Sequence, residues 1–240
     1  MARNPGACLI CGRPLQYFQQ EQEMTCVLCG KHFPSRASCE EGHYVCDDCH
    51  AKRGVEVILD YCRKSPLKDP IQMAQEIMDD PFIYMHGNEH HILVGATLLT
   101  AYHNAGGKLE LEPALEEMRK RGGSYPGGSC GFWGCCGAAV SAGMFCSIAT
   151  GTTPLSGKSW GLSNAITACA LERIAALGGP RCCKRNSFTA IRAAVEFSRE
   201  HLGVSMELPD RILCRHSSEN QQCIRKACPY YSGGMTQTTP

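Results

Sequence analysis

The pattern of hydrophobic and polar positions changes near residue 52 of this 240-residue chain. Before that point the sequence consists of short polar turns separated by cysteines, with few large apolar side chains. After it, apolar residues recur at the three- and four-residue intervals that place them on one face of a helix. We therefore expect a small cysteine-rich module over 1–52, a helical domain over 53–231 and a disordered tail over 232–240.

The periodic part of the chain predicts six or seven helices. Glycine pairs and prolines end most of them, because neither residue type continues a helix well. The segment 90–104 is apolar on nearly every side, which predicts a buried central helix. No strand pattern follows residue 52, so the predicted fold class is mainly α, a small ribbon, treble-clef or cross-brace zinc module followed by an all-α domain. The expected helices cover 53–64, 70–78, 90–104, 112–121, 133–150, 160–177 and 187–202.

Cysteine is the residue type that changes this picture most, with 18 in the chain. The 24 basic and 23 acidic residues leave a net charge of +1, so no general field attracts nucleic acid. The N-terminus lacks the apolar stretch of about 7–15 residues of a signal peptide, and no segment reaches the roughly 18 apolar residues of a membrane helix. We therefore predict a cytoplasmic protein with thiolates or metal-bound cysteines, and neither a membrane protein nor a secreted disulfide scaffold.

Metal-ligand spacing dominates the first fifty residues. Cys-x-x-Cys places two sulfurs on one ion from a tight turn, and Gly12 and Gly30 directly follow two such pairs. Seven cysteines and one histidine provide ligands for two tetrahedral ions, for which zinc is the best match and rubredoxin-like iron the alternative. A module this poor in apolar side chains needs bound metal to fold, so a structural role is expected. The predicted ligands are Cys8, Cys11, Cys26, Cys29, Cys39, His43, Cys46 and Cys49.

Two ways of pairing these ligands are open. From Cys26 to Cys49 their order and spacing resemble the central part of a RING-type cross-brace, although the last cysteine pair of that family is absent and an extra pair lies upstream. By that analogy, one ion binds Cys26, Cys29, Cys46 and Cys49, and the other binds Cys8, Cys11, Cys39 and His43. In sequential pairing, one ion binds Cys8, Cys11, Cys26 and Cys29, and the other binds Cys39, His43, Cys46 and Cys49.

A second set of cysteines lies beyond residue 125 in three clusters. In the first, glycines surround Cys130, Cys135 and Cys136 at an expected helix start, where unpaired N–H groups favour the thiolate. The alternative is packing in a tight helix of small residues, which is the role expected of Cys146 and Cys169. In the second cluster, three cations flank two adjacent thiols before a helix, which predicts a thiolate or anion site. Its residues are Arg181, Cys182, Cys183, Lys184 and Arg185.

The third cluster comprises Cys214, Cys223 and Cys228, the last followed by proline. Cys-Pro is common among iron–sulfur ligands. Together with a cysteine from another cluster, these three thiols would hold a [4Fe–4S] cluster or a third zinc ion. A plain structural clamp on the C-terminus is the alternative.

Two histidines offer a weaker signal. His86 and His90 are four residues apart, a spacing that lets two imidazoles on one helix face bind a metal. Pro81 and Gly87 interrupt the pattern, so a buried helix cap at His90 is the competing interpretation. We also consider His90 as a proton donor in a catalytic site.

Several motifs together resemble an uncharacterised prokaryotic family, a domain of unknown function. They are His90-His-x-Leu-Val, Pro126-Gly-Gly-Ser-Cys-Gly-x-Trp-Gly-x-Cys-Gly, Thr153-Pro-Leu-Ser, Gly178-Gly-Pro-Arg-Cys-Cys-Lys-Arg and Cys223-x-x-x-x-Cys-Pro. The resemblance spans nearly the full chain. It implies anaerobic metabolism and, as a partner, a methyltransferase or radical-SAM enzyme beside which such domains occur. It implies no particular reaction.

These observations predict an iron–sulfur or thiolate protein that acts in redox chemistry, sulfur transfer or metal-cofactor handling. Its site would comprise Cys130, Cys135, Cys136, Cys182 and Cys183, with Cys223 and Cys228 converging on it. Arg181, Lys184 and Arg185 would lower thiol pKa values or hold an anionic substrate. The alternatives are a non-catalytic zinc adaptor for a partner enzyme and an RNA-modification accessory factor, although the balanced charge disfavours nucleic acid.

Overall fold

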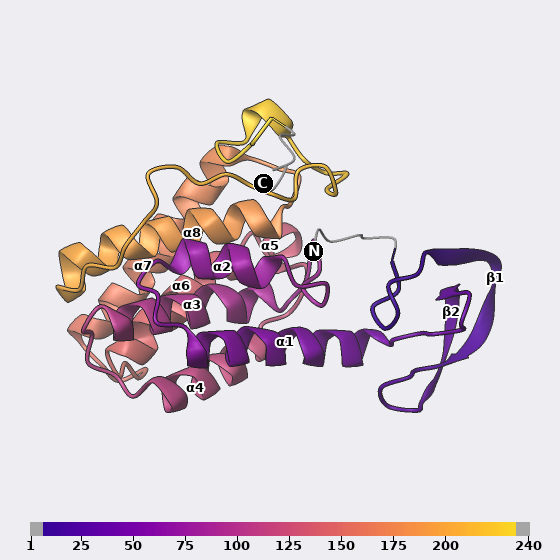
Figure 1. Cartoon of the computed structure of the whole chain (residues 1–240). Helices are drawn as coiled ribbons and strands as arrows, with labels where there is room; N and C mark the ends of the chain where they lie inside the picture. Colours follow the sequence, from indigo (N-terminus) through magenta and orange to yellow (C-terminus); the bar gives the residue numbers. More distant parts are fainter. Residues whose placement is uncertain (1–6, 234–240) are drawn as a thin grey trace.

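The computed structural model describes residues 7–233, which form a small hairpin module and a larger helical body (Figure 1). In the module, strand β1, Leu15–Thr25, pairs antiparallel with β2, His32–Cys39. The register shifts between Tyr17 and Gln22, which marks a bulge in β1. Most side chains of β1 and three of the eight in β2 are exposed, so the hairpin has almost no hydrophobic core to hold it.

The rest of the described chain is mainly helical up to Leu202, which confirms the mainly α prediction. The first four α-helices are α1 (Asp47–Lys64), α2 (Pro70–Met78), α3 (His90–Asn104) and α4 (Leu111–Ser124). They are followed by α5 (Ser129–Phe132), α6 (Gly137–Ala149), α7 (Lys158–Leu177) and α8 (Cys183–Phe197). The π-helical turn η1 (Ser198–Leu202) extends α8, and the 3₁₀ turn η2 (Arg225–Ala227) lies near the C-terminus.

Helix α3 lies at the centre of the helical body, as its apolar sequence predicts. Twelve of its residues, from His90 to Tyr102, are buried, and α1, α2, α4, α6 and α8 all contact it. Local sequence signals set the start of the neighbouring α2. The Asp69 side chain accepts hydrogen bonds there from the N–H groups of Ile71 and Gln72. Pro70 occupies the first turn, where a missing N–H costs nothing.

Small residues allow close approach between helices, as expected for the glycine- and alanine-rich segment. A Cβ atom at Gly143 of α6 would overlap the Thr167 hydroxyl of α7. In α3, the N–H of Gly95 donates to the Ser141 hydroxyl of α6 at 2.9 Å. The fold therefore sets α6 tightly between α3 and α7.

The structure moves several predicted helix boundaries. The helix expected over 133–150 begins only at Gly137, as α6, because Gly134 takes a left-handed φ of 64° in the turn that separates it from the short α5. Helix α4 runs through Gly122 instead of ending there, and the missing Cβ at Gly122 makes room for the backbone of His91. Helix α1 begins at Asp47, inside the cysteine-rich region, and passes residue 52 without a break. The division at residue 52 stays a prediction, and most of the predicted tail, 232–240, lies outside the described residues.

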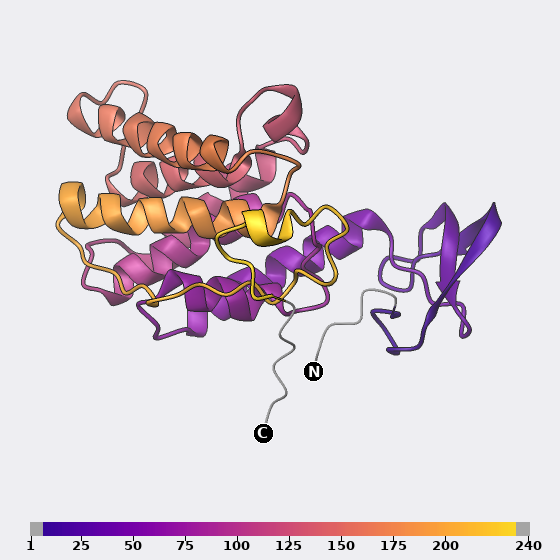
Figure 2. The same ribbon diagram turned by 90° about the horizontal axis from the view of Figure 1, so that it is seen from above.

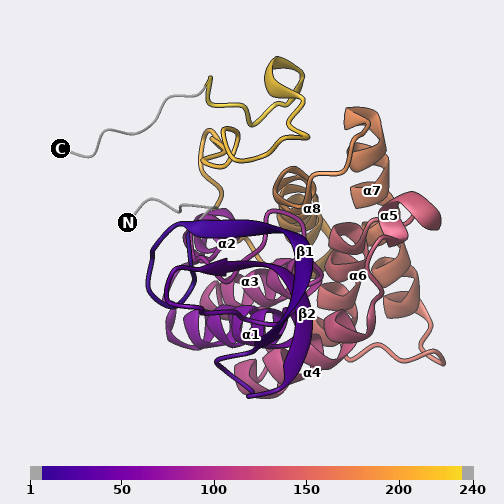
Figure 3. The same ribbon diagram turned by 90° about the vertical axis from the view of Figure 1, so that its right-hand side faces the viewer.

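The C-terminal segment after Gly203 is irregular and lies against the N-terminal end of α8 (Figure 2). The Tyr230 hydroxyl lies 3.0 Å from the Thr189 hydroxyl of α8, and Cys214 forms a single β-bridge with Tyr231. Viewed from its own end, the hairpin module lies in front of α1 and α3 and away from α7 (Figure 3). Within residues 7–233, no helix has the length and apolar character to cross a membrane.

Candidate metal centres

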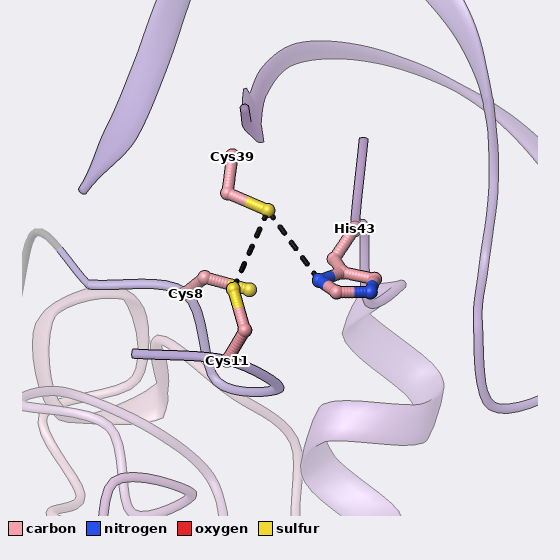
Figure 4. A group of neighbouring side chains, drawn as sticks. All are labelled: Cys8, Cys11, Cys39 and His43. Atoms are coloured by element: carbon pink, nitrogen blue, oxygen red, sulfur yellow. Dashed lines mark hydrogen bonds between the residues drawn. The ribbon is translucent and has the colours of Figure 1, made fainter. Parts of the chain in front are cut away.

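The structure gathers the eight N-terminal ligand candidates into two groups of four. One group is Cys8, Cys11, Cys39 and His43 (Figure 4), and the other is Cys26, Cys29, Cys46 and Cys49. Within each group the ligand atoms all lie within 4.8 Å of one another. Of the two pairings left open by the sequence, this is the cross-brace arrangement and not the sequential one.

The distances within the groups fit tetrahedral metal coordination. Two thiolates about 2.3 Å from one ion at the tetrahedral angle stand about 3.8 Å apart, and a thiolate and an imidazole about 3.5 Å apart. The Sγ atoms of Cys11 and Cys39 are 3.7 Å apart, and those of Cys29 and Cys46 are 3.8 Å apart. The Cys39 sulfur lies 3.5 Å from Nδ1 of His43, which identifies Nδ1 as the ligand atom.

Both upstream Cys-x-x-Cys pairs lie in tight turns closed by a glycine, as predicted. The N–H of Gly12 donates to the carbonyl of Cys8, and Gly12 has a left-handed φ of 74°. The second turn repeats this arrangement, with Gly30 at a φ of 71° donating to Cys26. These turns direct backbone N–H groups at sulfur, a feature of thiolates that hold metal.

Backbone hydrogen bonds lower the pKa of some of these thiols, whereas the closeness of the other thiols raises the pKa of others. Burial raises the pKa of Cys26, but N–H donors including that of Cys46 outweigh it and lower the pKa to about 6. By contrast, hydrogen bonding to Cys46, together with burial and Cys29, raises the pKa of Cys49 to about 12. Four neighbouring thiols resist losing all their protons without a cation among them, so the group as a whole favours a metal ion.

The helical body brings the second cysteine set to two adjoining pockets. The histidine pocket is a cavity of about 60 Å³ between the start of α3, α5, and the starts of α6 and α8. Its walls include His86, His90, His91, Cys130, Cys136, Arg181, Cys182, Cys183 and Asn186. The thiol pocket lies between the start of α8 and the C-terminal segment, and its walls include Cys182, Lys184, Arg185, Cys214, His216, Asn220, Cys223 and Cys228.

Cys182 belongs to both pockets. It caps the N-terminus of α8, and its sulfur accepts a hydrogen bond of 3.4 Å from the N–H of Arg185. The side-chain amide of Asn220 also donates to this sulfur at 3.5 Å. The structure thus joins the second and third cysteine clusters at one thiol, and Cys130 and Cys136 reach the same region from α5 and α6.

Cys136 and Cys183 differ from the expectation of low thiol pKa values. Cys136 caps α6 and accepts a hydrogen bond from the Asn186 amide at 3.3 Å, yet burial raises the pKa of its thiol. Burial also raises the pKa of Cys183 to about 12. Desolvation outweighs the helix N-terminus here, so these thiols are protonated until a cation binds them.

The three cations near Cys182 have different surroundings. Arg181 is exposed at the wall of the histidine pocket. Lys184 is fully buried and donates to the carbonyl of Tyr84 at 3.0 Å. Arg185 is buried and donates to the carbonyls of Gly178 and Pro180. Two of the three therefore hold the backbone around the pockets, a role that the charge pattern alone did not indicate.

His90 is buried at the first turn of α3. Its Nδ1 lies 3.1 Å from the carbonyl of Gly87, and its neighbour Glu89 is also buried. Burial and the charge of Lys184 lower the pKa of His90 to about 4. The imidazole is therefore neutral at neutral pH, and its role as a catalytic proton donor stays a prediction.

The remaining cysteines of the helical body lie outside both pockets. Cys135 is close by, and its carbonyl accepts a hydrogen bond from the Tyr125 hydroxyl. Cys146 is buried in the core and Cys169 packs against it, as expected for structural thiols. Sequence reasoning missed Asn186 and Asn220, whose amides donate to pocket sulfurs, because a single asparagine carries no spacing signal.

Comparison with known proteins assigns the helical body to a protein family. Residues 58–231 match the sequence profile of a family described as a family of unknown function, DUF5714. The chain belongs to the DUF5714 family. The DUF5714 region contains both pockets and excludes the two N-terminal ligand groups. No curated protein and no solved structure matches the chain.

Proposed function

We propose that this DUF5714 protein is an iron–sulfur protein whose cluster is held by Cys182, Cys214, Cys223 and Cys228. The observation that carries the proposal is the convergence of these four thiols, from the start of α8 and the C-terminal segment, on one pocket. The N-terminal module would hold two zinc ions in a structural role. The cluster would serve redox chemistry, sulfur transfer or metal-cofactor handling at the adjoining histidine pocket.

Backbone donors support metal binding by these thiols. The N–H of His216 donates to the sulfur of Cys214 at 3.4 Å, and the N–H of Arg225 donates to that of Cys223 at the same distance. The N–H of Ile10 has the same relation to Cys8 in the N-terminal module, also at 3.4 Å. Such bonds stabilise a thiolate and tune the potential of a bound cluster.

The sulfurs of the thiol pocket are less closely gathered than the ligands of a single ion, which is compatible with a cluster. Among the described residues, only the two N-terminal groups have three or more ligand atoms within 4.8 Å of one another. A cubane of four irons and four sulfides is larger than one ion, so its cysteine sulfurs stand farther apart. The proline after Cys228 is also typical of iron–sulfur ligands.

Anaerobic reconstitution with iron and sulfide tests the proposal. We expect a brown protein with absorbance near 400 nm and about four irons per chain beyond any bound zinc. Cys182→Ser and Cys223→Ser should lose most of this absorbance, while Cys169→Ser, a thiol on α7 outside both pockets, should retain it. A wild-type protein that stays colourless would overturn the cluster assignment.

A second candidate function is a zinc-containing adaptor for a partner enzyme of the methyltransferase or radical-SAM type. It is favoured by a cavity of about 260 Å³ between the N-terminal module and the helical body, with mostly apolar walls that include Leu9, Leu15, Val45 and Tyr84. A colourless protein that contains zinc alone and co-purifies with such an enzyme would support this function. A cytoplasmic, anaerobic setting suits both functions, because free thiols and clusters need reducing conditions.

A further inference from the structure

The histidine pocket contains a buried imidazole nitrogen that has no partner among residues 7–233. Nδ1 of His90 faces two acceptors, the carbonyl of Gly87 at 3.1 Å and the Glu89 carboxylate at 3.4 Å, so it must carry the proton. Nε2 of the neutral ring therefore has a free lone pair. This nitrogen is buried, the whole side chain is 1% exposed, and it has no hydrogen-bond partner. Such an atom usually has an ion or a water molecule beside it.

His86 repeats this arrangement from the loop before α3. Its Nε2 lies 3.3 Å from Oδ1 of Asn220, an oxygen that also accepts the N–H of Gln222. Because Oδ1 is an acceptor, Nε2 of His86 must be the donor, which leaves the lone pair on Nδ1. Within the described chain, that Nδ1 is likewise buried without a partner. Hydrogen bonds thus fix each ring in the tautomer whose other nitrogen carries no proton.

The other groups around this pocket favour a cation over an anion. Cys136 and Cys183 contribute half-buried thiols, and both would become good ligands once a cation replaced their protons. The Asn186 amide is already engaged by the Cys136 sulfur, and Arg181, the cation in the pocket wall, is exposed to solvent. Neutral imidazole and thiolate together suit borderline transition metals such as zinc, cobalt and iron.

We propose that the histidine pocket binds an exchangeable divalent transition-metal ion through Nδ1 of His86, Nε2 of His90 and the thiolates of Cys136 and Cys183. This site goes beyond the proposed cluster and does not require it. Among the described residues, no three ligand atoms of this pocket are gathered within 4.8 Å, unlike those of the N-terminal module. Binding therefore requires these side chains to close around the ion, for which a cavity of about 60 Å³ leaves room.

Two substitutions separate metal binding from structural hydrogen bonding. His90→Asn keeps an N–H donor near the position of Nδ1, toward Gly87, and removes Nε2. His86→Gln keeps a donor near the position of Nε2, toward Asn220, and removes Nδ1. His103→Asn is the matched control, because Nδ1 of this exposed histidine makes the same kind of bond to the carbonyl of Leu109, at 3.2 Å.

Equilibrium dialysis against Co²⁺, with metals counted by mass spectrometry, tests the site in the full chain loaded with zinc and, separately, with the cluster. We expect one bound cobalt per chain without loss of zinc or iron. His90→Asn and His86→Gln should each weaken cobalt binding at least about tenfold, while His103→Asn binds as wild type. Equal binding by all four proteins, or no bound cobalt in the wild type, would overturn the proposal.

The same measurement in Cys223→Ser separates this site from the cluster. In that variant the cluster should be lost, while the histidine-dependent cobalt should persist, because His86, His90, Cys136 and Cys183 are unchanged. If the wild type also proves colourless but still binds this cobalt, the proposed function fails and the metal site stands.

Discussion

At the residue scale, the environment of a side chain decides its chemistry here more than its identity does. Cys26 is a buried cysteine and Cys183 a half-buried one, and both lie beside other cysteines. Backbone donors lower the pKa of Cys26 to about 6 despite its burial, whereas burial raises that of Cys183 to about 12. The residue type predicts a ligand in both places, but only the surrounding N–H groups decide which thiol ionises first.

The neutral His90 predicts a dependence of stability on pH. Its native pKa of about 4 lies below the ordinary value of 6.5, so between these pH values the unfolded chain binds more protons than the native one. The contribution of His90 to the free energy of unfolding is therefore complete above pH 6.5. It is lost as the pH falls toward 4, at up to about 1.4 kcal/mol per pH unit. Urea unfolding from pH 7 to pH 5 should show a shallower loss in His90→Asn than in wild type, with His103→Asn as control. Identical slopes in all three proteins would contradict the assignment.

At the element scale, α1 connects the hairpin module to the helical body. Cys46 caps this helix and Cys49 lies in its first turn, so two ligands of one group are fixed by a helix whose other end is in the core. Gly54 lies between these two parts of the helix. It is buried, and a Cβ there would stand 2.7 Å from the backbone carbonyl of Phe82.

Gly54→Ala should therefore destabilise the protein by about 1–3 kcal/mol, although alanine is the better helix former. The carbonyl of Phe82 is part of the backbone and cannot turn aside as a flexible side chain would. The matched substitution is Gly161→Ala in α7, where a Cβ meets nothing within 4 Å and the site is exposed. It should stabilise by up to about 1 kcal/mol. Thermal unfolding of both variants measures the difference, and a stabilising Gly54→Ala would show that the contact is not as close as described.

At the scale of the whole molecule, the two parts depend on different forces. The main hydrophobic core begins at Ile58 and ends at Tyr230, and no residue of the hairpin module belongs to it. The module has instead two groups of four ligands and a mostly exposed hairpin. We therefore expect metal binding to be the main source of its folding free energy.

Removal of metal by a strong chelator should unfold the module and leave most of the helical body folded. We expect amide hydrogens in residues 8–46 to lose their protection, while those of α3 and of α1 from Ile58 onward stay protected. Hydrogen exchange followed by mass spectrometry gives this comparison directly. Loss of protection in α3 together with the module would show that the two parts unfold as one unit.

The sequence by itself determined the elements and the kinds of ligand. Helical periodicity predicts α2 and α3 with the boundaries that the structure has, because Pro70 and the glycines after Asn104 are strong local signals. It also identifies the eight N-terminal ligands, because Cys-x-x-Cys spacing is a property of a single turn. It could not place the start of α6 at Gly137, because the left-handed turn at Gly134 looks the same in sequence as a glycine within a small-residue helix.

Only the tertiary structure decided how these ligands combine. It selects the cross-brace grouping of the N-terminal ligands over the sequential one. It also places Cys182 in one pocket with Cys214, Cys223 and Cys228. His86 and His90 line one cavity although they share no helix face. It also assigns buried structural contacts to Lys184 and Arg185. The physical reason is that spacing along the chain limits only local geometry, whereas burial, tautomers and contacts between distant segments depend on how the helices pack.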